Sequence, residues 1–345
     1  MNEKQWSVLV DVINGKTIEP MPIGFIIDSP WLPGWAGISI MDYYSSEQLW
    51  LDANFKAINE FPDTIFLPGF WSEYGMCTEP SAFGARCAWQ ENEFPFAHPI
   101  IKSTGDIDSI EKPDPVSDGL LPFVISRLKH TQKQIEQEGH SIKFAIARGP
   151  LNIASFLMGT TEFLMATQME PEKILKLLDT ITSFLVDWIK LQAEIFPTID
   201  GILILDDIVG FIGEPDFLKF AKPYLQKVFN CVEAKVKFFH NDAPGLVCAP
   251  HLADIGINLF NFSSDHSITQ MRELVGEKVT LLGNIPPRDV LAQGTPEDVR
   301  NAVQAMLEPL TDRSRIIASC GGGMPQDVST ENINAFIEAI RKQPL

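Results

Sequence analysis

Eight short runs rich in β-branched and aromatic residues alternate along this chain with longer segments of helical periodicity. Runs that are apolar at nearly every position are typical of strands buried on both faces, and such strands belong to parallel sheets. The runs cover residues 23–28, 64–69, 143–150, 201–207, 236–242, 258–263, 279–284 and 315–320. Eight alternating β/α units predict an α/β fold of the (β/α)8 TIM-barrel type, in preference to a doubly wound open sheet.

The pattern predicts one domain that spans residues 1–345, because a barrel with insertions reaches this length as a single unit. Two connections, about 29–61 and 70–140, are too long for simple loops and are expected to be N-terminal helical insertions. Long insertions on a barrel usually form lids or binding loops. Their tryptophans, Trp31, Trp35, Trp71 and Trp89, either wall an apolar ligand or pack the insertions onto the barrel.

The formal net charge of −18 restricts the possible partners. Nucleic acid is not expected, because a phosphate backbone is bound by clustered lysines and arginines. A strongly anionic substrate is also disfavoured, unless a local basic pocket overrides the field of the whole protein.

Cysteine usage and hydropathy indicate the cellular compartment and the solubility of the protein. Its five cysteines form no C-x-x-C pair, and the N-terminus reads as a short amphipathic helix instead of a secretory leader. No apolar run approaches the ~20 residues needed to span a membrane. We expect a soluble, cytoplasmic protein with no membrane association, and the oligomeric state stays open.

Polar residues follow most of the predicted strands, where a barrel carries its active site. Read in chain order, these residues are Asp28, Arg148, Asp206, Asp207, His240, Asn241, Asp242, Ser263, Asn284 and Cys320. Because the carboxyl ends of parallel strands meet at one end of a barrel, we expect these side chains to converge on one pocket.

Three of these residues offer nitrogen, oxygen and sulfur to a metal. His240 and Asp242 lie two residues apart in "KFFHNDAP", and Cys320 ends the last strand in "RIIASC". Three protein ligands with one open position are what a catalytic zinc requires. Such an ion acts as a Lewis acid or lowers the pKa of a bound thiol or water. The alternative is a hydrogen-bonded His–Asp pair beside a buried, inert cysteine.

The remaining candidates are assigned by residue type. Asp206, Asp207 and Asp242 are candidate catalytic groups that act as acid or base, position a substrate or bind a metal. Arg148 is a plausible carboxylate clamp. The other candidate substrate-binding residues are Asn241, Asn284, Gly321 and Gly322, and the two glycines belong to a run that either offers backbone N–H groups to an anion or makes a tight turn.

Several stretches resemble the uroporphyrinogen decarboxylase superfamily. They are "GPLNIASFLMG", "GILILDDIVGFI" followed by "FAKPYLQKV", "GNIPPRDVLAQGTPEDV" and "CGGGMPQDVSTENINAFIEAI". The resemblance runs in the right order from about residue 140 to the C-terminus and is looser before it. It implies the barrel independently of the strand pattern.

The true decarboxylases of that superfamily carry features that this chain lacks. An arginine-rich N-terminal motif binds the substrate's carboxylates there, whereas no arginine precedes Arg86 here. The decarboxylases also place an aspartate after an early strand, where this chain reads "IFLPG", and a histidine between two glycines, where it has Gly322. Porphyrinogen decarboxylation is therefore not expected, and decarboxylation of a smaller carboxylate with Arg148 as clamp remains the alternative.

The chain is more similar to the corrinoid-dependent methyltransferase branch. Zinc ligands in that branch follow an H-x-C…C pattern, which His240 and Cys320 match, while Asp242 replaces the middle cysteine. The resemblance implies transfer of a methyl group between a corrinoid protein and a small-molecule donor or acceptor, with zinc as cofactor. A carboxylate in place of a thiolate makes zinc harder, so the acceptor is either a thiol or a pterin, or the substrate is a methoxy or methylamine compound. A noncatalytic tetrapyrrole-binding protein would need fewer titratable groups.

Overall fold

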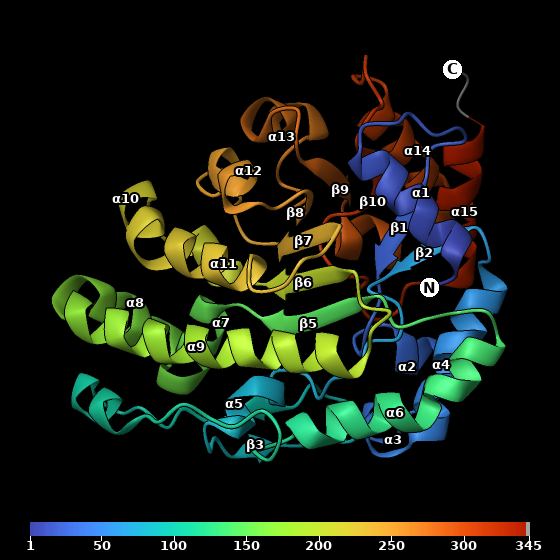
Figure 1. Cartoon of the computed structure of the whole chain (residues 1–345). Helices are drawn as coiled ribbons and strands as arrows, with labels where there is room; N and C mark the ends of the chain where they lie inside the picture. Colours follow the sequence, from blue (N-terminus) through green and yellow to red (C-terminus); the bar gives the residue numbers. More distant parts are fainter. Residues whose placement is uncertain (343–345) are drawn as a thin grey trace.

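The structure is a computed structural model and describes residues 1–342. Eight parallel strands form one curled sheet in the spatial order β2-β1-β10-β9-β8-β7-β6-β5 (Figure 1). Their bounds are β1 Ile23–Ile26, β2 Thr64–Leu67, β5 Phe144–Arg148, β6 Gly201–Leu205, β7 Val236–Asn241, β8 Leu259–Phe262, β9 Thr280–Ile285 and β10 Ile316–Cys320. All eight predicted runs form strands of this sheet, so the expected TIM-barrel-like fold is confirmed.

Strands β2 and β5 are the two edges of the sheet, and no strand pairing links them within residues 1–342. The N-terminus of the chain lies between these two edges. Asn2 forms an antiparallel bridge with His140, just before β5, and the Met1 ammonium donates to the Ser141 carbonyl. On the other side, the Gln5 amide donates to the Thr64 carbonyl at the start of β2. The first residues of the chain therefore connect the two edge strands at their amino ends.

Helix α1 (Glu3–Ile13) closes the amino end of the barrel. It starts with a capping box between Asn2 and Gln5, and its apolar side packs on the inward-facing side chains of the strands. Trp6 meets Phe144 of β5 edge-on, with ring centroids 5.6 Å apart. Because this end is filled by apolar side chains, the open end that remains is the carboxyl end of the strands.

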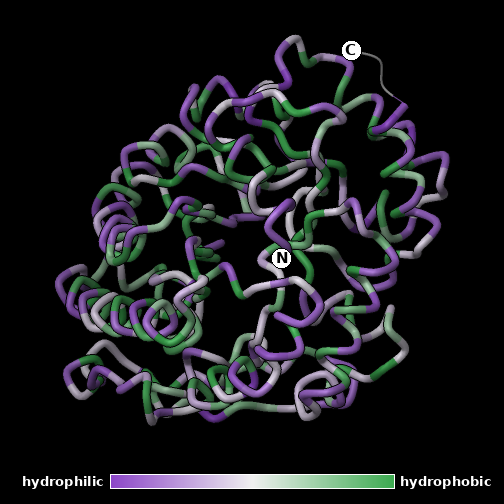
Figure 2. Tube along the Cα trace, turned by 45° about the vertical axis from the view of Figure 1, so that its right-hand side comes forward, coloured by the Kyte–Doolittle hydropathy of each residue, from purple (hydrophilic) through white to green (hydrophobic). Residues whose placement is uncertain are grey.

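Helices surround the sheet, and apolar segments gather inside while polar ones run along the periphery (Figure 2). The helices are α2 Leu32–Ala36, α3 Ile40–Ser45, α4 Glu47–Glu60, α5 Thr78–Ala82, α6 Leu121–Gln137, α7 Pro150–Met158, α8 Thr160–Met169, α9 Pro171–Ile195, α10 Glu214–Asp216, α11 Lys222–Phe229, α12 Leu252–Ile255, α13 Ile268–Val275, α14 Pro296–Leu307 and α15 Thr330–Arg341. The shorter elements are the helical turns η1 Thr104–Ser109, η2 Asp207–Phe211, η3 Phe217–Ala221, η4 Ala249–His251 and η5 Pro287–Ala292, and the hairpin of β3 Cys87–Ala88 with β4 Phe96–Ala97.

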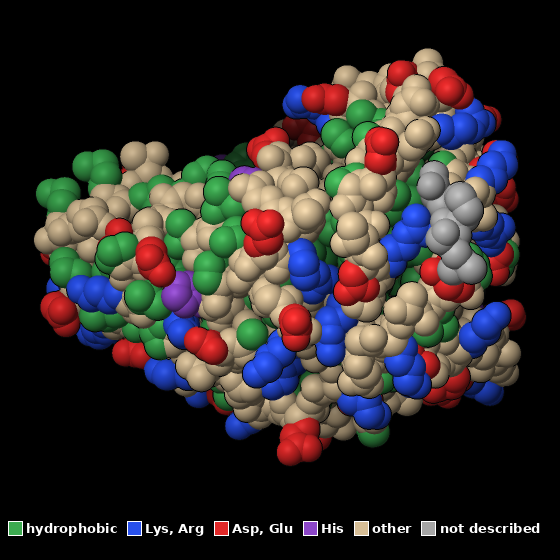
Figure 3. All heavy atoms as spheres, turned by 90° about the horizontal axis from the view of Figure 1, so that it is seen from above, with side chains coloured by type: hydrophobic (Ala, Val, Ile, Leu, Met, Phe, Trp, Pro, Cys, Tyr) green, Lys and Arg blue, Asp and Glu red, His purple; other side chains and the backbone are tan. Residues whose placement is uncertain are grey.

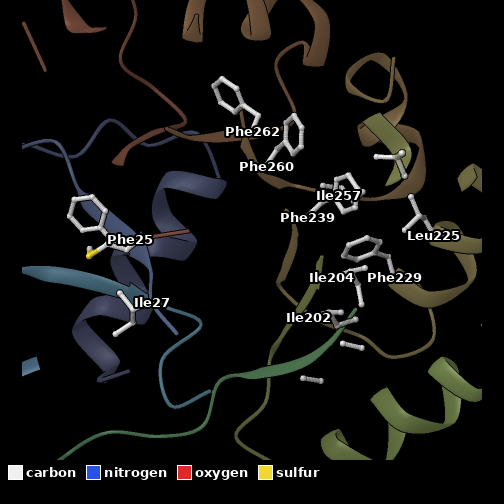
Figure 4. Close-up of a cluster of buried hydrophobic side chains, with 14 of the residues drawn as sticks. Phe25, Ile27, Ile202, Ile204, Leu225, Phe229, Phe239, Ile257, Phe260 and Phe262 are labelled. Carbon is white, nitrogen blue, oxygen red and sulfur yellow. The ribbon is translucent and has the colours of Figure 1, made fainter. Parts of the chain in front are cut away.

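Strand residues alternate between the barrel interior and the layer under the helices. Phe239 of β7 faces outward and packs on Phe229 of α11, with ring centroids 6.2 Å apart (Figure 4). Its neighbours Phe238 and His240 therefore face inward, and Phe238 belongs to the apolar cluster under α1. This alternation decides which polar strand ends reach the open mouth.

The two long connections carry helices, as expected. Residues 29–61 contain α2, α3 and α4, and residues 70–140 contain α5, the β3–β4 hairpin, η1 and α6. Trp31 and Trp71 are buried, and Trp31 stacks on Trp35 at 4.9 Å, so these rings pack the insertions onto the barrel. Within the described residues, none of the helices combines the length and apolarity needed to cross a bilayer.

Candidate active site

One row of inward-facing residues crosses the carboxyl end of the sheet. In the strand register, Arg148 of β5 pairs with Leu205 of β6, Leu205 with His240 of β7, and His240 with Asn261 of β8. Adjacent strands lie about 4.8 Å apart, so the Cα atoms of Arg148 and His240 are separated by about 10 Å. Arg148 and His240 therefore lie at the same mouth of the barrel.

Asp207, His240 and Asp242 come together on one side of this mouth. Each offers one ligand atom, and the three atoms lie within 4.8 Å of one another. Nε2 of His240 is 3.8 Å from Oδ1 of Asp207 and 3.9 Å from Oδ2 of Asp242. These separations are too long for hydrogen bonds and about half an ångström longer than the ~3.3 Å between ligand atoms that each lie about 2 Å from one tetrahedral zinc ion, so small side-chain movements would bring the three atoms onto one ion.

Asn261 sets the proton position on His240. The Asn261 amide nitrogen donates to the carbonyl oxygens of Leu282, at 2.9 Å, and Cys320, at 3.2 Å, so its Oδ1 faces His240. Nδ1 of His240 lies 2.8 Å from that oxygen and is assigned as the donor. The lone pair is then on Nε2, which faces the two carboxylates, and this is how metal-binding histidines are usually oriented.

The two carboxylates are held differently. Asp207 is fixed at its backbone, because Oδ1 of Asn152 in α7 accepts from the N–H groups of Asp207 and Ile208. Its side chain accepts from the Asp242 backbone N–H at 3.1 Å. Burial, and then the negative charge of Asp207, raise the pKa of Asp242 above its ordinary value, while His240 opposes the shift. Two carboxylates that crowd each other beside an imidazole lone pair fit a divalent cation such as zinc.

Cys320, expected as a third ligand, is not in this group, and among residues 1–342 Asp207 takes its place. Ile317 of β10 faces the barrel interior, so strand alternation turns Cys320 outward, where it packs in the core under the helices. The thiol is fully buried, and burial raises its pKa to about 12. A thiol in this position is a packing group.

Asp206 is likewise separated from its neighbour Asp207. It is fully buried, and its two carboxylate oxygens accept from the backbone N–H groups of Leu151 and Asn152 at the start of α7, at 2.9 and 3.0 Å. Burial is the main reason why the pKa of Asp206 is raised well above its ordinary value. A Cβ at Gly149 would lie 2.3 Å from Oδ2 of Asp206, so only glycine fits there. Asp206 anchors a helix and does not face the mouth.

Arg148 lies on the other side of the mouth and is already paired. Its guanidinium lies 2.9 Å from Oε2 of Glu73 and 3.7 Å from Oε2 of Glu79, and both glutamates are buried. Oε1 of Glu79 also accepts from the Arg148 backbone N–H. The arginine expected to clamp a substrate carboxylate is thus neutralised by carboxylates of the chain itself.

Asp28, Glu73 and Glu79 complete this side of the mouth, and we call these three the acidic side. Burial, followed by the charge of Glu73, raises the pKa of Asp28 well above its ordinary value. Glu73 also accepts from the Ser29 hydroxyl, which accepts from the Tyr44 hydroxyl. The two glutamates were not expected at the site, and their only signal is an acidic residue in the apolar stretch "GFWSEYG" and another in "CTEPSAFG".

The remaining candidates shape the loops around the mouth. Asn241 faces away from it and is fully buried, with its Oδ1 accepting from the Ala243 N–H. The Asn284 amide donates to the Ser263 carbonyl and ties β9 to the loop after β8. A Cβ at Gly321 would lie 2.5 Å from the Ser264 nitrogen, so glycine is required for that close approach. Gly322 faces the site directly, because a Cβ there would lie 3.3 Å from Cβ of Asp242.

The fold and the site define a TIM-barrel-like enzyme with polar residues gathered at the carboxyl ends of its strands. The model of the uroporphyrinogen decarboxylase (URO-D) family matches residues 7–343, and the chain belongs to this family. The superfamily resemblance read from the sequence is confirmed.

The chain is also similar to curated relatives in sequence and to solved structures in fold. The chain is 28% identical over 278 residues to uroporphyrinogen decarboxylase from Chloroherpeton thalassium, covering 76% of each chain. It is 25% identical to the enzyme of that name from Mannheimia succiniciproducens, covering 77% of this chain and 76% of the other. Among solved structures, a methyltransferase from Methanosarcina mazei superposes with a TM-score of 0.82 at 19% identity, covering 97% of this chain and 98% of the other. A B12-independent methionine synthase from Shewanella superposes with a TM-score of 0.56 at 12% identity, over 93% and 98%. At these identities the structural likenesses show the fold.

Proposed function

We propose that this protein is a methyltransferase that moves a methyl group between a corrinoid protein and a small molecule, with zinc bound at the mouth of the barrel. The observation that carries the proposal is the group formed by Asp207, His240 and Asp242, in which Asn261 leaves Nε2 of His240 free to bind a metal. The sequence resemblance to the corrinoid-dependent branch and the fold of the Methanosarcina methyltransferase support it.

A zinc ion held by Asp207, His240 and Asp242 would supply Lewis acidity to the heteroatom that carries or receives the methyl group. The half-exposed Asp242 keeps the position open to a substrate, and Asn261 holds the imidazole. A corrinoid on the partner would supply the cobalt that gives or takes the methyl group, and transfer in line with the substrate heteroatom would form one bond to carbon as the other breaks. With two carboxylates and one imidazole, the ligand set is harder than one built from thiolates and suits oxygen or nitrogen in the substrate.

Exposed apolar side chains beside the mouth support a protein partner. Phe211 ends the turn that begins at Asp207 and is 60% exposed, and Leu246, four residues after Asp242, is 40% exposed. Hydrophobic side chains also gather at the left end of the molecule seen from above, over the region of α8 and α10 (Figure 3). Exposed apolar patches commonly mark protein interaction sites. We place the reaction in the cytoplasm because all five cysteines are free.

The alternative of decarboxylating a smaller carboxylate has less support. It depends on Arg148 as a clamp for the substrate, and Glu73 and Glu79 already occupy that guanidinium. A substrate carboxylate would have to displace an intramolecular ion pair in a region of negative charge.

The cobalt spectrum tests the proposal. A corrinoid protein reduced to the Co(I) state is mixed with the enzyme and methylated amines, ethers and thioethers, and its methylation is followed by absorbance. Wild-type protein is expected to methylate cobalt from at least one compound, while His240→Ala loses the activity and the surface control His130→Ala, whose side chain is 66% exposed, keeps it. Zinc-loaded wild type that leaves the cobalt spectrum unchanged with every compound, and with methylated corrinoid in the reverse direction, contradicts the proposal.

A further inference from the structure

The charges on the two sides of the mouth bear on the substrate. The last residue of each strand and the two residues that follow it include one arginine, Arg148, and no lysine. Two glutamates face this single guanidinium, so carboxyl groups outnumber the cation in the trio of Arg148, Glu73 and Glu79. Asp28 lies within electrostatic reach of Glu73 and Arg148 and adds a further carboxyl group.

Asp28 also has a free acceptor atom. Strand alternation turns Asp28 inward, because Ile26 of β1 belongs to the apolar cluster inside the barrel. Its Oδ1 is buried and has no hydrogen-bond partner among the described residues. A buried polar atom without a partner is costly, and such an atom at a functional mouth indicates a ligand or ordered water that completes it.

The charged neighbours of Asp28 indicate the same local field. Burial and the neighbouring Glu73 make the ionised form of Asp28 unfavourable, although Arg148 lies nearby. Of these two charged neighbours, Glu73 acts on Asp28 more strongly than Arg148 does, so their combined potential at Asp28 is negative. A cation placed there gains from that potential, whereas a carboxylate, sulfonate or phosphate is repelled.

We infer that the acidic side of the mouth binds the protonated amino group of a small substrate whose other end reaches Asp207, His240 and Asp242. The inference rests on the proposed function and names the substrate class for it. An ammonium group donates N–H to Oδ1 of Asp28 and to Glu73, and the ~10 Å between the Cα atoms of Arg148 and His240 leaves room for a bridge of a few atoms. The reacting heteroatom is then at the metal side, and the amine is the nonreacting end.

Three probes of equal length test this charge selection: 2-methoxyethylamine, 2-methoxyethanol and methoxyacetate. Their binding to the zinc-loaded full chain at pH 7 is measured by calorimetry and ligand-observed NMR. We expect the amine to bind at least about tenfold more tightly than the alcohol, and methoxyacetate to bind most weakly. Tighter or equal binding of methoxyacetate, or no detectable binding of the amine, overturns the inference.

Variants locate the effect. Asp28→Asn and Glu73→Gln are each expected to reduce the preference for the amine over the alcohol about tenfold. Glu136→Gln removes the same charge from an exposed position on α6 and is expected to leave the preference unchanged. Asp28→Asn retains the side-chain shape, and Oδ1 of Asp28 has no intramolecular partner to lose. A change of amine affinity in this variant therefore does not arise from a rearrangement of the site. Unchanged amine affinity in both variants, with normal zinc content, overturns the inference.

The outcomes separate this inference from the proposed function. An amine preference that depends on Asp28, without any change of a cobalt spectrum, keeps the amine site and contradicts methyl transfer. Cobalt methylation from 2-methoxyethanol or methoxyacetate without preference for the amine supports methyl transfer and contradicts the amine site.

Discussion

Nδ1 of His240 lies 2.8 Å from Oδ1 of Asn261, and this contact leaves Nε2 of the ring facing Asp207 and Asp242. The orientation of Asn261 is in turn fixed by its two donor contacts to the carbonyls of Leu282 and Cys320. The proton position on His240 is thus determined by backbone carbonyls of β9 and β10. Neither strand supplies one of the three candidate metal ligands, Asp207, His240 and Asp242.

Replacing Asn261 by leucine is expected to weaken zinc binding about 10- to 100-fold, because the histidine loses the partner that holds its tautomer and orientation. Competition with a coloured chelator measures the affinity. Asn230→Leu is the control, since Asn230 bonds at the end of α11 and lies outside the site. Equal zinc affinity in Asn261→Leu and wild type would show that the contact does not orient a ligand.

Asp206→Ala is expected to destabilise the fold and to leave zinc binding in place. The variant leaves the backbone N–H groups of Leu151 and Asn152 buried without their acceptor, which costs about 1–3 kcal/mol. Urea unfolding and metal content, measured on the same preparation, separate the two effects. Loss of zinc at unchanged stability would instead place Asp206 in the metal site.

The Cys320 thiol makes stability depend on alkaline pH. Its pKa of about 12 in the folded chain lies above the value of 9 expected without burial, so between these pH values the unfolded chain has lost a proton that the folded chain keeps. The free energy of unfolding therefore falls as pH rises, by up to about 1.4 kcal/mol per pH unit for one thiol. Urea unfolding between pH 8 and 10.5 should show a smaller fall in Cys320→Ala than in wild type. An identical fall in Cys320→Ala and wild type would mean that the thiol ionises as freely in the folded chain.

Phe211→Ser is expected to weaken binding of the corrinoid protein about tenfold without changing zinc content, because an exposed aromatic ring beside the mouth is a typical interface anchor. Surface plasmon resonance measures the dissociation constant. Phe123→Ser removes an equally exposed ring, at 59% against 60%, from α6 and serves as the control. Equal weakening in both variants, or none in Phe211→Ser, would remove this surface from the account.

The strands and the position of the mouth could be predicted because they depend on local pattern. Continuous apolar runs identify strands buried on both faces, and each polar residue after such a run identifies a carboxyl end. His240 and Asp242 were expected together for this reason, and the structure brings them together.

Because these strands are apolar on both faces, the sequence does not show which of their residues face the barrel interior. A strand buried on both faces has no polar–apolar alternation, so "RIIASC" does not reveal that Ile317 and Ser319 face the interior and Cys320 the helices. For the adjacent pair Asp206 and Asp207, only the structure shows that one anchors α7 and the other joins the metal group.

The pairing of Arg148 with Glu73 and Glu79 could not be predicted from the sequence, for a different reason. Glu73 and Glu79 lie about seventy residues earlier in the chain, inside an insertion with no repeating pattern, and meet Arg148 only through tertiary packing. A lone arginine at a strand end is typical of an anion clamp, and the carboxylates that neutralise it leave no mark near it in the sequence.

The metal content of the purified protein tests the central claim most directly. Zinc is measured by elemental analysis in wild type, Asp207→Asn, His240→Ala and Cys320→Ser, each prepared without chelator and again after incubation with zinc. One zinc per chain is expected in wild type and Cys320→Ser, and its loss is expected in Asp207→Asn and His240→Ala. Wild type that stays metal-free after incubation with zinc, or zinc lost in Cys320→Ser and kept in Asp207→Asn, would contradict the claim.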